Sequence, residues 1–517
     1  MFLLPRSESY YRYRCAYQSP SSSSHKLTYE EKTMLFAIFL VFFCASKTSA
    51  EFNLFGEPGQ AYSIQVNLGH PYQRLSVLVD TGSTTLAIAS NVQDSTIFFQ
   101  AGNSTSIYDS GKEVQARYSQ GMWWGKLVSD FIDFPSLPNV PEVRTDIALI
   151  TKSENFFING SGWQGLLGLA YLPVGARGDK IIVESWLDSL ERTTSKPMSF
   201  QMKLCGPQSM TNATHYGKFN MLDDQTINYN SNKTFRTPIL RKRWYEVGIL
   251  SIRVLTNISD DKESITKHVI SDSPYRDQEM CQKLNAEKSI VDSGTTNIRV
   301  PEAYFRPVVD ELKNAAQASN VLILNEFWYR GEAACWPEPQ EWSLPWLAID
   351  ILSLDADNLF FTLEIPSRNY MRVVKARNNT SHNGIVSEYC YKLGLEAGNK
   401  ETVLGYTAME GFEVLFNRSA GWIGFRTSNC GSDTRISGPH NASTSLKSLC
   451  NLVTPSHELD TSIKAAQWVL FAVSIIAIGV LVYLLAPCVK MLVFKPSPNS
   501  PQISLSQAAL VEQDTNN

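Results

Sequence analysis

The chain has 517 residues, of which 43% are hydrophobic and 19% charged, and its net charge is -4 at pH 7. This is ordinary globular composition, and the length suffices for two lobes that each bury a core. So small a net charge gives no support for a nucleic-acid partner or a strongly charged substrate, and we expect neither.

The first apolar run extends from Met34 to Ala45, and small residues follow it up to Ala50. It is too short to span a bilayer comfortably, and Lys32 in front of it completes the layout of a secretory signal peptide. We therefore predict an N-terminal extension and signal peptide over residues 1–50, cleaved near Ala50. The polar stretch before Met34 leaves open a second start site there, or a run that stays uncleaved as an anchor.

Beyond this leader, the sequence reads as short strands separated by turns. Residues 61–68 alternate like a half-buried strand, and Ser76 to Val79 form a short apolar strand that runs into an Asp-Thr-Gly turn. Similar β-branched runs recur as far as residues 421–425, whereas helical patterns are clearest at 181–190 and 301–318. The pattern predicts a mainly β fold.

The two halves of the chain share a loose internal repeat. The first half contains Leu-Val-Asp80-Thr-Gly-Ser-Thr and later Gly-Leu-Leu-Gly-Leu at 165–169. The second half contains Ile-Val-Asp292-Ser-Gly-Thr-Thr and later Thr-Val-Leu-Gly-Tyr at 402–406. Two similar β lobes that face each other would bring both aspartates into one cleft. We predict an N-terminal lobe over 51–228 and a C-terminal lobe over 229–450.

Each Asp-Thr/Ser-Gly turn suits a catalytic carboxylate. Glycine permits a tight turn with its amide near the carboxylate, and a following hydroxyl can bond the outer carboxylate oxygen. Two such carboxylates share one proton, so the ionised one can take a proton from water while the other polarises a carbonyl group. A single turn of this kind is often only a hairpin turn, but two copies in matching contexts favour catalysis. The candidates are Asp80 and Asp292, supported by Thr81, Gly82, Ser83, Ser293, Gly294 and Thr295.

A second apolar run, from Ala465 to Val489, is long enough to cross a membrane as one helix. Lys490 and Lys495 follow it, whereas Lys464 precedes it, and this slight basic excess favours a cytoplasmic C-terminus. A buried core helix is the alternative, which the position near the end of the chain disfavours. We predict a stalk over 451–464, a transmembrane helix over 465–489 and a cytoplasmic tail over 490–517.

Features between the two apolar runs indicate a luminal or extracellular compartment. The N-glycosylation sequons lie there, and so do six of the nine cysteines, an even number that suggests three disulfides in an oxidising compartment. Sequence alone leaves the pairing open. The sequons are at Asn103, Asn159, Asn212, Asn232, Asn257, Asn378, Asn379, Asn417 and Asn441, and the cysteines are Cys205, Cys281, Cys335, Cys390, Cys430 and Cys450.

The region from about Gly59 to Cys450 resembles the pepsin clan of aspartic proteases and, within it, the beta-secretase (memapsin) family. The resemblance rests on three motifs, at residues 156–171, 289–301 and 409–412, which include Trp-Gln-Gly-Leu-Leu-Gly-Leu, Ser-Ile-Val-Asp-Ser-Gly-Thr-Thr and Met-Glu-Gly-Phe. It implies a bilobal pepsin-like fold with a C-terminal membrane helix, peptide-bond hydrolysis without metal or other cofactor, and protein substrates.

The sequence alone predicts a hairpin with its turn at Gln120-Gly121. The resemblance implies that this hairpin is a flap over the cleft. Tyr118 and Trp123 match the family's flap tyrosine and the tryptophan that holds its hydroxyl; ordinary cross-strand packing is the alternative. The same matching gives substrate-binding roles to Gln120, Phe156, Ile158, Trp163, Tyr245, Thr296, Asn297 and Arg299.

Two of these assignments have plainer alternatives, because Arg299 could be a solvated strand residue and Tyr245 could equally serve the core. The resemblance places Arg299 beside the second substrate residue before the scissile bond, and Tyr245 on the other side of that bond. It also implies the disulfides Cys205–Cys430, Cys281–Cys450 and Cys335–Cys390.

Three features depart from the family pattern. Residues 50–59 leave almost no room for a propeptide, so we expect that no activation cleavage is needed. The spacer at 256–277 is longer and more polar, which indicates a surface insertion. The tail after Val489 has no acidic dileucine signal, so the sequence gives no support for the endosomal sorting that is usual in the family.

The sequence thus predicts a single-pass type I membrane aspartic endopeptidase with an acidic optimum, which cleaves ectodomains of membrane proteins. We expect a monomer or weak dimer in the secretory pathway, in endosomes or at the cell surface. A non-catalytic receptor on the same fold is disfavoured because Asp80, Asp292 and Tyr118 are all present. A soluble digestive or lysosomal enzyme is disfavoured by the second apolar run and the cysteine pattern.

Overall fold

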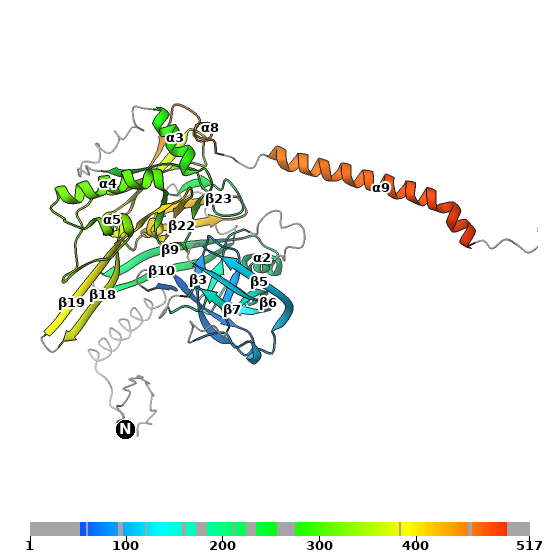
Figure 1. The fold of residues 1–517 in the computed structure, drawn as a ribbon, viewed down its shortest axis with the longest axis horizontal. Coiled ribbons are helices and arrows are strands. Elements are labelled where there is room, and N and C mark those ends of the chain that lie inside the picture. The colour runs from blue at the N-terminus through cyan, green and yellow to red at the C-terminus, as the bar shows by residue number, and fades with distance from the viewer. Residues whose placement is uncertain are drawn as a thin grey trace, which may run out of the picture.

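The structure is a computed structural model, and it describes residues 52–57, 60–90, 97–118, 121–157, 162–171, 183–209, 212–223, 234–255, 274–381, 384–452 and 457–493. Most of its regular structure is β, so the predicted mainly β class is confirmed (Figure 1). The predicted leader over 1–50, the spacer over 256–273 and the tail after Val493 lie outside the described residues.

The largest sheet has 13 strands, in the order β11-β23-β22-β9-β10-β1-β2-β3-β8-β4-β7-β6-β5. It draws strands from both halves of the chain and therefore joins them. Its members are β1 (Leu54–Gly56), β2 (Ser63–Leu68), β3 (Gln73–Asp80), β4 (Leu86–Ala89), β5 (Tyr108–Arg117), β6 (Met122–Asp133), β7 (Val143–Glu154), β8 (Gly165–Gly168), β9 (Met198–Ser209), β10 (Asn212–Asp223), β11 (Phe235–Pro238), β22 (Phe412–Asn417) and β23 (Trp422–Thr427).

Three smaller sheets belong to the second half of the chain, in the orders β12-β16-β17-β24, β13-β21-β14-β20 and β15-β19-β18. Their strands are β12 (Ile249–Leu255), β13 (Ser289–Val291), β14 (Ile298–Pro301), β15 (Ala334–Trp336), β16 (Trp346–Leu352), β17 (Leu359–Ile365), β18 (Met371–Ser381), β19 (Gly384–Leu393), β20 (Leu395–Gly398), β21 (Thr402–Leu404) and β24 (Arg435–Asn441).

The internal repeat seen in the sequence is a repeat of strand pairing. In the first half, β3 runs parallel to β8, and β8 is antiparallel to β4. In the second half, β13 runs parallel to β21, and β21 is antiparallel to β14. Asp80 ends β3, and Asp292 directly follows β13, so each aspartate leaves the same point of an equivalent three-strand unit.

The helices are short, apart from two. They are η1 (Ala101–Asn103), α2 (Trp186–Thr194), α3 (Pro274–Leu284), α4 (Glu302–Ala318), α5 (Asn325–Arg330), α6 (Ser367–Tyr370), α7 (Tyr406–Met409), α8 (Leu446–Leu449) and α9 (His457–Val493). The helix expected over 181–190 is shifted: α2 begins at Trp186 because the Ser185 hydroxyl caps it by accepting from the amide of Asp188. The helix expected from Pro301 is α4.

An aromatic junction holds the two halves in a fixed relation. The rings of Phe200 on β9 and Phe416 on β22 stack with their centroids 4.7 Å apart, and Tyr245 lies against Phe416 at 4.7 Å. Beside them, the buried Arg418 donates to the carbonyl of Leu169 at 3.1 Å and to the carboxylate of Asp188 at 3.0 Å. Because these groups are packed from both sides, the relative position of the two aspartate turns is set by the core.

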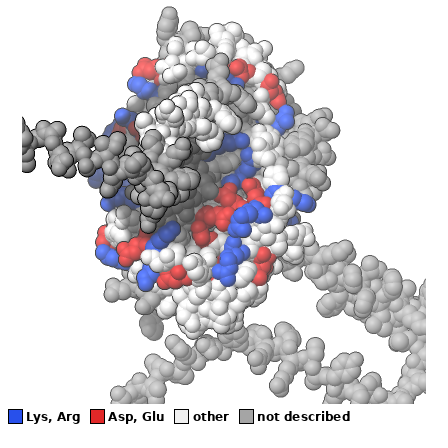
Figure 2. Space-filling view, turned by 90° about the vertical axis from the view of Figure 1, so that its right-hand side faces the viewer, with Lys and Arg blue, Asp and Glu red and all other residues white. Residues whose placement is uncertain are grey.

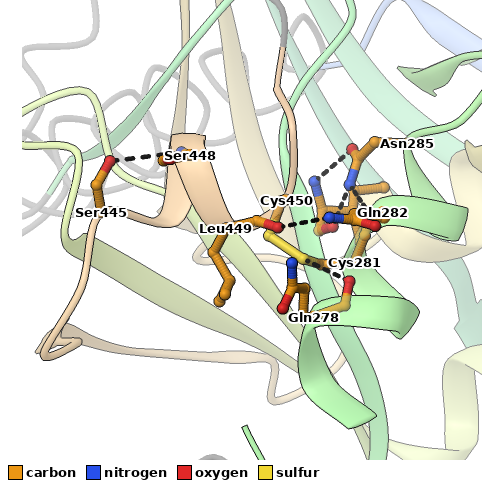
Figure 3. Close-up of a disulfide and its surroundings, with 9 residues drawn as sticks. Gln278, Cys281, Gln282, Asn285, Ser445, Ser448, Leu449 and Cys450 are labelled. Carbon is orange, nitrogen blue, oxygen red and sulfur yellow. Dashed lines mark hydrogen bonds between the residues drawn. A yellow bond between two sulfur atoms is a disulfide. The ribbon is translucent and has the colours of Figure 1, made fainter. Parts of the chain in front are cut away.

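The structure joins Cys205 to Cys430, Cys281 to Cys450 and Cys335 to Cys390. Figure 3 shows that the second of these fastens α8 to α3, where Gln282 also donates its side-chain amide to the carbonyl of Leu449 at 3.0 Å. This pair of contacts fixes the end of the β-rich part of the chain, a few residues before α9 begins.

The long helix α9 extends away from the β-rich body (Figure 1). Its segment Ala466–Ala486 has a mean hydropathy of 2.8 and exposed side chains, so it is long and apolar enough to cross a membrane. The helix already begins at His457, inside the segment expected to be a stalk.

Candidate active site

The two aspartate turns meet through a reciprocal pair of hydroxyl contacts. The Thr81 amide donates to the Ser293 hydroxyl at 3.1 Å, and the Ser293 amide donates to the Thr81 hydroxyl at 3.0 Å. Each hydroxyl then donates across to a strand of the other half, Thr81 to the carbonyl of Val291 at 2.8 Å and Ser293 to that of Val79 at 2.7 Å. Both side chains are fully buried, so these four bonds lock the turns together.

Glycine is required where each turn faces the opposite aspartate. A Cβ atom at Gly82 would lie 2.5 Å from a carboxylate oxygen of Asp292, and one at Gly294 would clash with the carboxylate of Asp80. Each glycine therefore lies directly against the opposite carboxylate, where the space tolerates no side chain.

The carboxylates receive matching hydrogen bonds. Asp80 accepts from the Gly82 amide at 2.8 Å and from the Ser83 hydroxyl. Asp292 accepts from the Gly294 amide at 2.9 Å and from the Thr295 hydroxyl at 2.7 Å. All the predicted supporting residues thus surround the pair, and the arrangement is close to two-fold symmetric.

The electrostatics of the pair favour one shared proton. Asp80 and Asp292 are only 5% and 9% exposed. Burial raises the pKa of Asp80 well above its ordinary value and the charge of Asp292 raises it further, although the bonds from Ser83 and Gly82 act in the opposite direction. Two adjacent carboxylates cannot both ionise easily, so the pair can hold one acid and one base at the same time.

The predicted hairpin is present: β5 pairs with β6 from Tyr108, opposite Ser129, to Arg117, opposite Met122. The amide of Tyr118 donates to the carbonyl of Gly121 at 2.8 Å. The Tyr118 ring lies against Phe156, with a centroid distance of 5.4 Å. Burial raises the pKa of the Tyr118 phenol to about 12, the charge of Asp80 adds to the rise, and the nearby Trp123 and Ser83 oppose it.

These influences place the Tyr118 hydroxyl close to Asp80, Ser83 and Trp123. The indole nitrogen of Trp123 is buried and has no hydrogen-bond partner among the described residues, so it influences the phenol without a regular hydrogen bond to it.

Behind the hairpin, aromatic side chains form one cluster. Trp163 packs edge-on against Phe156 at 5.8 Å and in a tilted arrangement against Phe157 at 5.2 Å, and its indole nitrogen donates to the side chain of Gln60 at 3.1 Å. The predicted site residues Gln120 and Ile158 lie outside the described residues. Phe157 and Gln60 were not predicted as site residues: Phe157 lies within the matched motif at 156–171 but was given no role, and Gln60 belongs to none of the three motifs.

The residues after the second turn have different environments. Thr296 accepts through its carbonyl from the Thr407 hydroxyl at 2.7 Å, and Asn297 donates its amide to Glu396 at 2.8 Å. Arg299 lies in β14 and pairs with Glu396 and Glu401.

Tyr245 is fully buried, and its hydroxyl donates to the carbonyl of Leu169 at 2.7 Å. It packs against Phe200 and Phe416 in the aromatic junction. Of the two alternatives for Tyr245, this environment favours the core role over a place in the wall of the cleft.

One group of side chains has the spacing of a metal site, but a disulfide bond rules it out as one. Within the described part of the chain, Cys335, Glu388 and Cys390 come close enough to share an ion, but the two sulfurs form a disulfide. A disulfide sulfur is not a thiolate and cannot serve as an ordinary metal ligand. The expectation that the chain needs no metal or cofactor stays a prediction.

Similarity to known proteins covers both aspartate turns. The family described as eukaryotic aspartyl protease matches residues 61–428. A beta-secretase of Strongylocentrotus purpuratus is 32% identical over 396 residues, which are 73% of this chain and 68% of that protein.

Two further relatives match shorter stretches. Chymosin of Ovis aries is 24% identical over 154 residues, 27% of this chain and 40% of the relative. Pregnancy-associated glycoprotein 2 of Sus scrofa is 25% identical over 129 residues, 24% of this chain and 30% of the relative. The predicted pepsin-like fold and enzyme class are confirmed, and the chain belongs to the pepsin family of eukaryotic aspartyl proteases as a beta-secretase-like aspartic endopeptidase.

Proposed function

We propose that this endopeptidase is anchored in a membrane by α9 and cleaves the ectodomains of membrane proteins, with Asp80 and Asp292 as its catalytic pair. The observation that supports the catalytic assignment is the reciprocal bonding of Thr81 and Ser293, which joins the two aspartate turns. The lobes carrying them correspond to residues 51–228 and 229–450.

The chemistry follows from one proton shared by two carboxylates. The ionised carboxylate removes a proton from a water molecule, which attacks the carbonyl carbon of the scissile peptide, while the protonated carboxylate gives its proton to the carbonyl oxygen. The resulting tetrahedral diol collapses when a proton reaches the amide nitrogen, which leaves as an amine. No group of the protein becomes covalently attached to the substrate.

The hairpin around Tyr118 acts as the flap. Because the Tyr118 hydroxyl lies near Asp80 and Ser83, a peptide bound over the carboxylates would be enclosed between the pair and the flap. Excluding water in this way strengthens every polar contact to the reacting groups. The ring cluster of Phe156 and Trp163 then provides an apolar wall for a bulky substrate side chain.

Membrane anchoring is supported by the composition and exposure of α9, and the three disulfides fit an oxidising compartment. In this arrangement the β-rich part is luminal or extracellular in the secretory pathway. Tethering an enzyme beside a bilayer raises its effective concentration toward substrates in the same bilayer, so membrane proteins are the favoured substrates.

The test is cleavage of a peptide library across pH by the detergent-solubilised full chain. Asp80→Asn and Asp292→Asn should each abolish cleavage, since either change removes the acid–base pair. Asp433→Asn is the matched control, because Asp433 is exposed and far along the chain from either turn. Equal activity of the wild type and both dyad variants would overturn the catalytic assignment. Loss of membrane binding should follow deletion of residues 466–486, and retention would refute the anchor.

A further inference from the structure

A charged cluster lies beside the second aspartate turn. Arg299 on β14 is the register partner of Glu396 on the parallel strand β20, and its guanidinium donates to one oxygen of Glu396 through Nε at 2.8 Å and Nη2 at 2.6 Å. Its Nη1 lies 3.5 Å from the carboxylate of Glu401. The three side chains are 14%, 30% and 19% exposed, so Arg299 is the most enclosed of them.

The cluster is connected to the catalytic pair through Asn297. This residue donates to the second oxygen of Glu396 at 2.8 Å and stands two residues after Thr295, which bonds Asp292. Two extended residues span at most about 7 Å. A substrate lying extended over the pair repeats its side chains on one face about every 7 Å, so a residue near the scissile bond can reach the cluster.

Each nitrogen of the Arg299 guanidinium already faces a carboxylate oxygen, whereas the carboxylate oxygens can accept further hydrogen bonds. Arg372, which is buried, donates to the side-chain oxygen of Asn297 at 2.7 Å, so Asn297 links a second arginine to Glu396. Burial opposes ionisation of Glu401, but backbone amides and the charges of Arg299 and Lys288 outweigh burial and lower its pKa. Glu401 therefore keeps its charge in a mildly acidic compartment.

We propose that Glu396 and Glu401 form a specificity site that accepts an uncharged hydrogen-bond donor or a basic side chain of the substrate and rejects an acidic one. The inference rests on the proposed function of the cleft. An arginine beside a cleft would by itself attract a carboxylate, but here the guanidinium is enclosed by two carboxylates of the protein. An incoming acidic side chain would meet the negative charge of both carboxylates, whereas an uncharged donor or a basic group could donate a hydrogen bond to them.

The experiment compares peptides that differ at single positions on either side of the scissile bond, each carrying Gln, Lys or Glu. The wild-type full chain should prefer Gln and Lys over Glu at one position by roughly tenfold or more in kcat/KM. Glu396→Gln with Glu401→Gln should release Arg299 and shift the ratio toward the Glu peptide by a similar factor. Glu401→Gln alone, which disturbs the longer contact, should give a smaller shift in the same direction.

Glu338→Gln is the matched control, because Glu338 is exposed and lies outside the cluster. A thermal melt should show that the carboxamide variants are folded, and the ratio of the Gln to the Glu peptide is compared within each variant. If folded variants cleave the Gln peptides and keep the wild-type ranking at every position, the specificity proposal is refuted while the proposed endopeptidase function stands. If the wild type cleaves no peptide of the library, the proposed function itself fails.

Discussion

Replacing Thr81 with valine tests whether the reciprocal hydroxyl contacts hold the two halves together. Valine keeps the shape of threonine, so the change creates no cavity. It leaves the amide of Ser293 and the carbonyl of Val291 without their partners in a fully buried place. Each unsatisfied buried group costs about 1–3 kcal/mol, so Thr81→Val should lower the free energy of unfolding by about 2–6 kcal/mol.

Ser293→Ala removes the other two bonds and should cost a similar amount. The two residues share a network, so the double variant should differ from the sum of the single ones. The measurement is denaturant unfolding followed by tryptophan fluorescence, with peptide cleavage recorded on the same samples. Thr427→Val is the control, because Thr427 is exposed at the end of β23 and the change should stay within about 0.5 kcal/mol. A Thr81→Val protein as stable and as active as Thr427→Val would refute the reasoning.

Three further predictions concern titration, modification and the flap. The pKa of Asp80 is raised in the folded state, so the stability that its protonation contributes is complete below the ordinary pKa of 3.8 and is lost as pH rises through the raised pKa. Asp80→Asn should remove this loss of stability. Melting temperatures of the wild type and the variant that stay parallel across pH would contradict this prediction. Asn417 is a sequon residue with no exposed surface, and its side-chain oxygen accepts from the amide of Ala420 at 2.9 Å. Glycopeptide mass spectrometry should therefore find Asn417 without a glycan, whereas the exposed Asn441 is accessible to glycosylation. A glycan on Asn417 would show that the sequon is modified before this strand folds. Tyr118→Ala should lower kcat/KM about tenfold or more. Tyr118→Phe keeps the ring packing against the aromatic cluster, so it should lower kcat/KM less. Equal losses in the two variants would mean that ring packing plays no part in cleavage.

The sequence was sufficient for features whose determinants are adjacent along the chain. At Asp80 and Asp292, the strand, the glycine and the hydroxyl residue that form each turn lie within a few residues of the aspartate. The hairpin before Met122 is recognisable from the residues of its turn. The apolar segment of α9 is equally local, because length and composition suffice to recognise it.

Contacts between distant strands could not be predicted in this way. Arg299 and Glu396 are 97 residues apart and become neighbours only because β14 and β20 pair in a particular register. The buried contact of His215 with Glu410, at 2.6 Å, joins residues 195 apart. The alternation of burial along β14 distinguishes Arg299 from the buried Ile298 and Val300, but does not reveal which carboxylates Arg299 meets.

The start of α2 illustrates a smaller difficulty. Residues 181–190 contain the apolar pattern of a helix, but the structure begins the helix at Trp186, where the Ser185 side chain supplies a cap. The apolar spacing alone gives no preference between these starting points. Cap geometry decides the boundary, and it depends on backbone angles that a pattern of side chains does not specify.

The disulfide between Cys281 and Cys450 has a consequence for where a substrate can be cut. It fastens the β-rich part of the chain up to Leu452, so only the next residues separate that part from the apolar segment that begins at Ala466. Residues 453–456 reach at most about 14 Å, and the helical stretch from His457 to Ala466 adds about 14 Å. With α9 in a bilayer, these two lengths set an upper limit on how far the β-rich part can stand from the membrane surface, so peptide bonds beyond that reach would escape cleavage whatever their side chains.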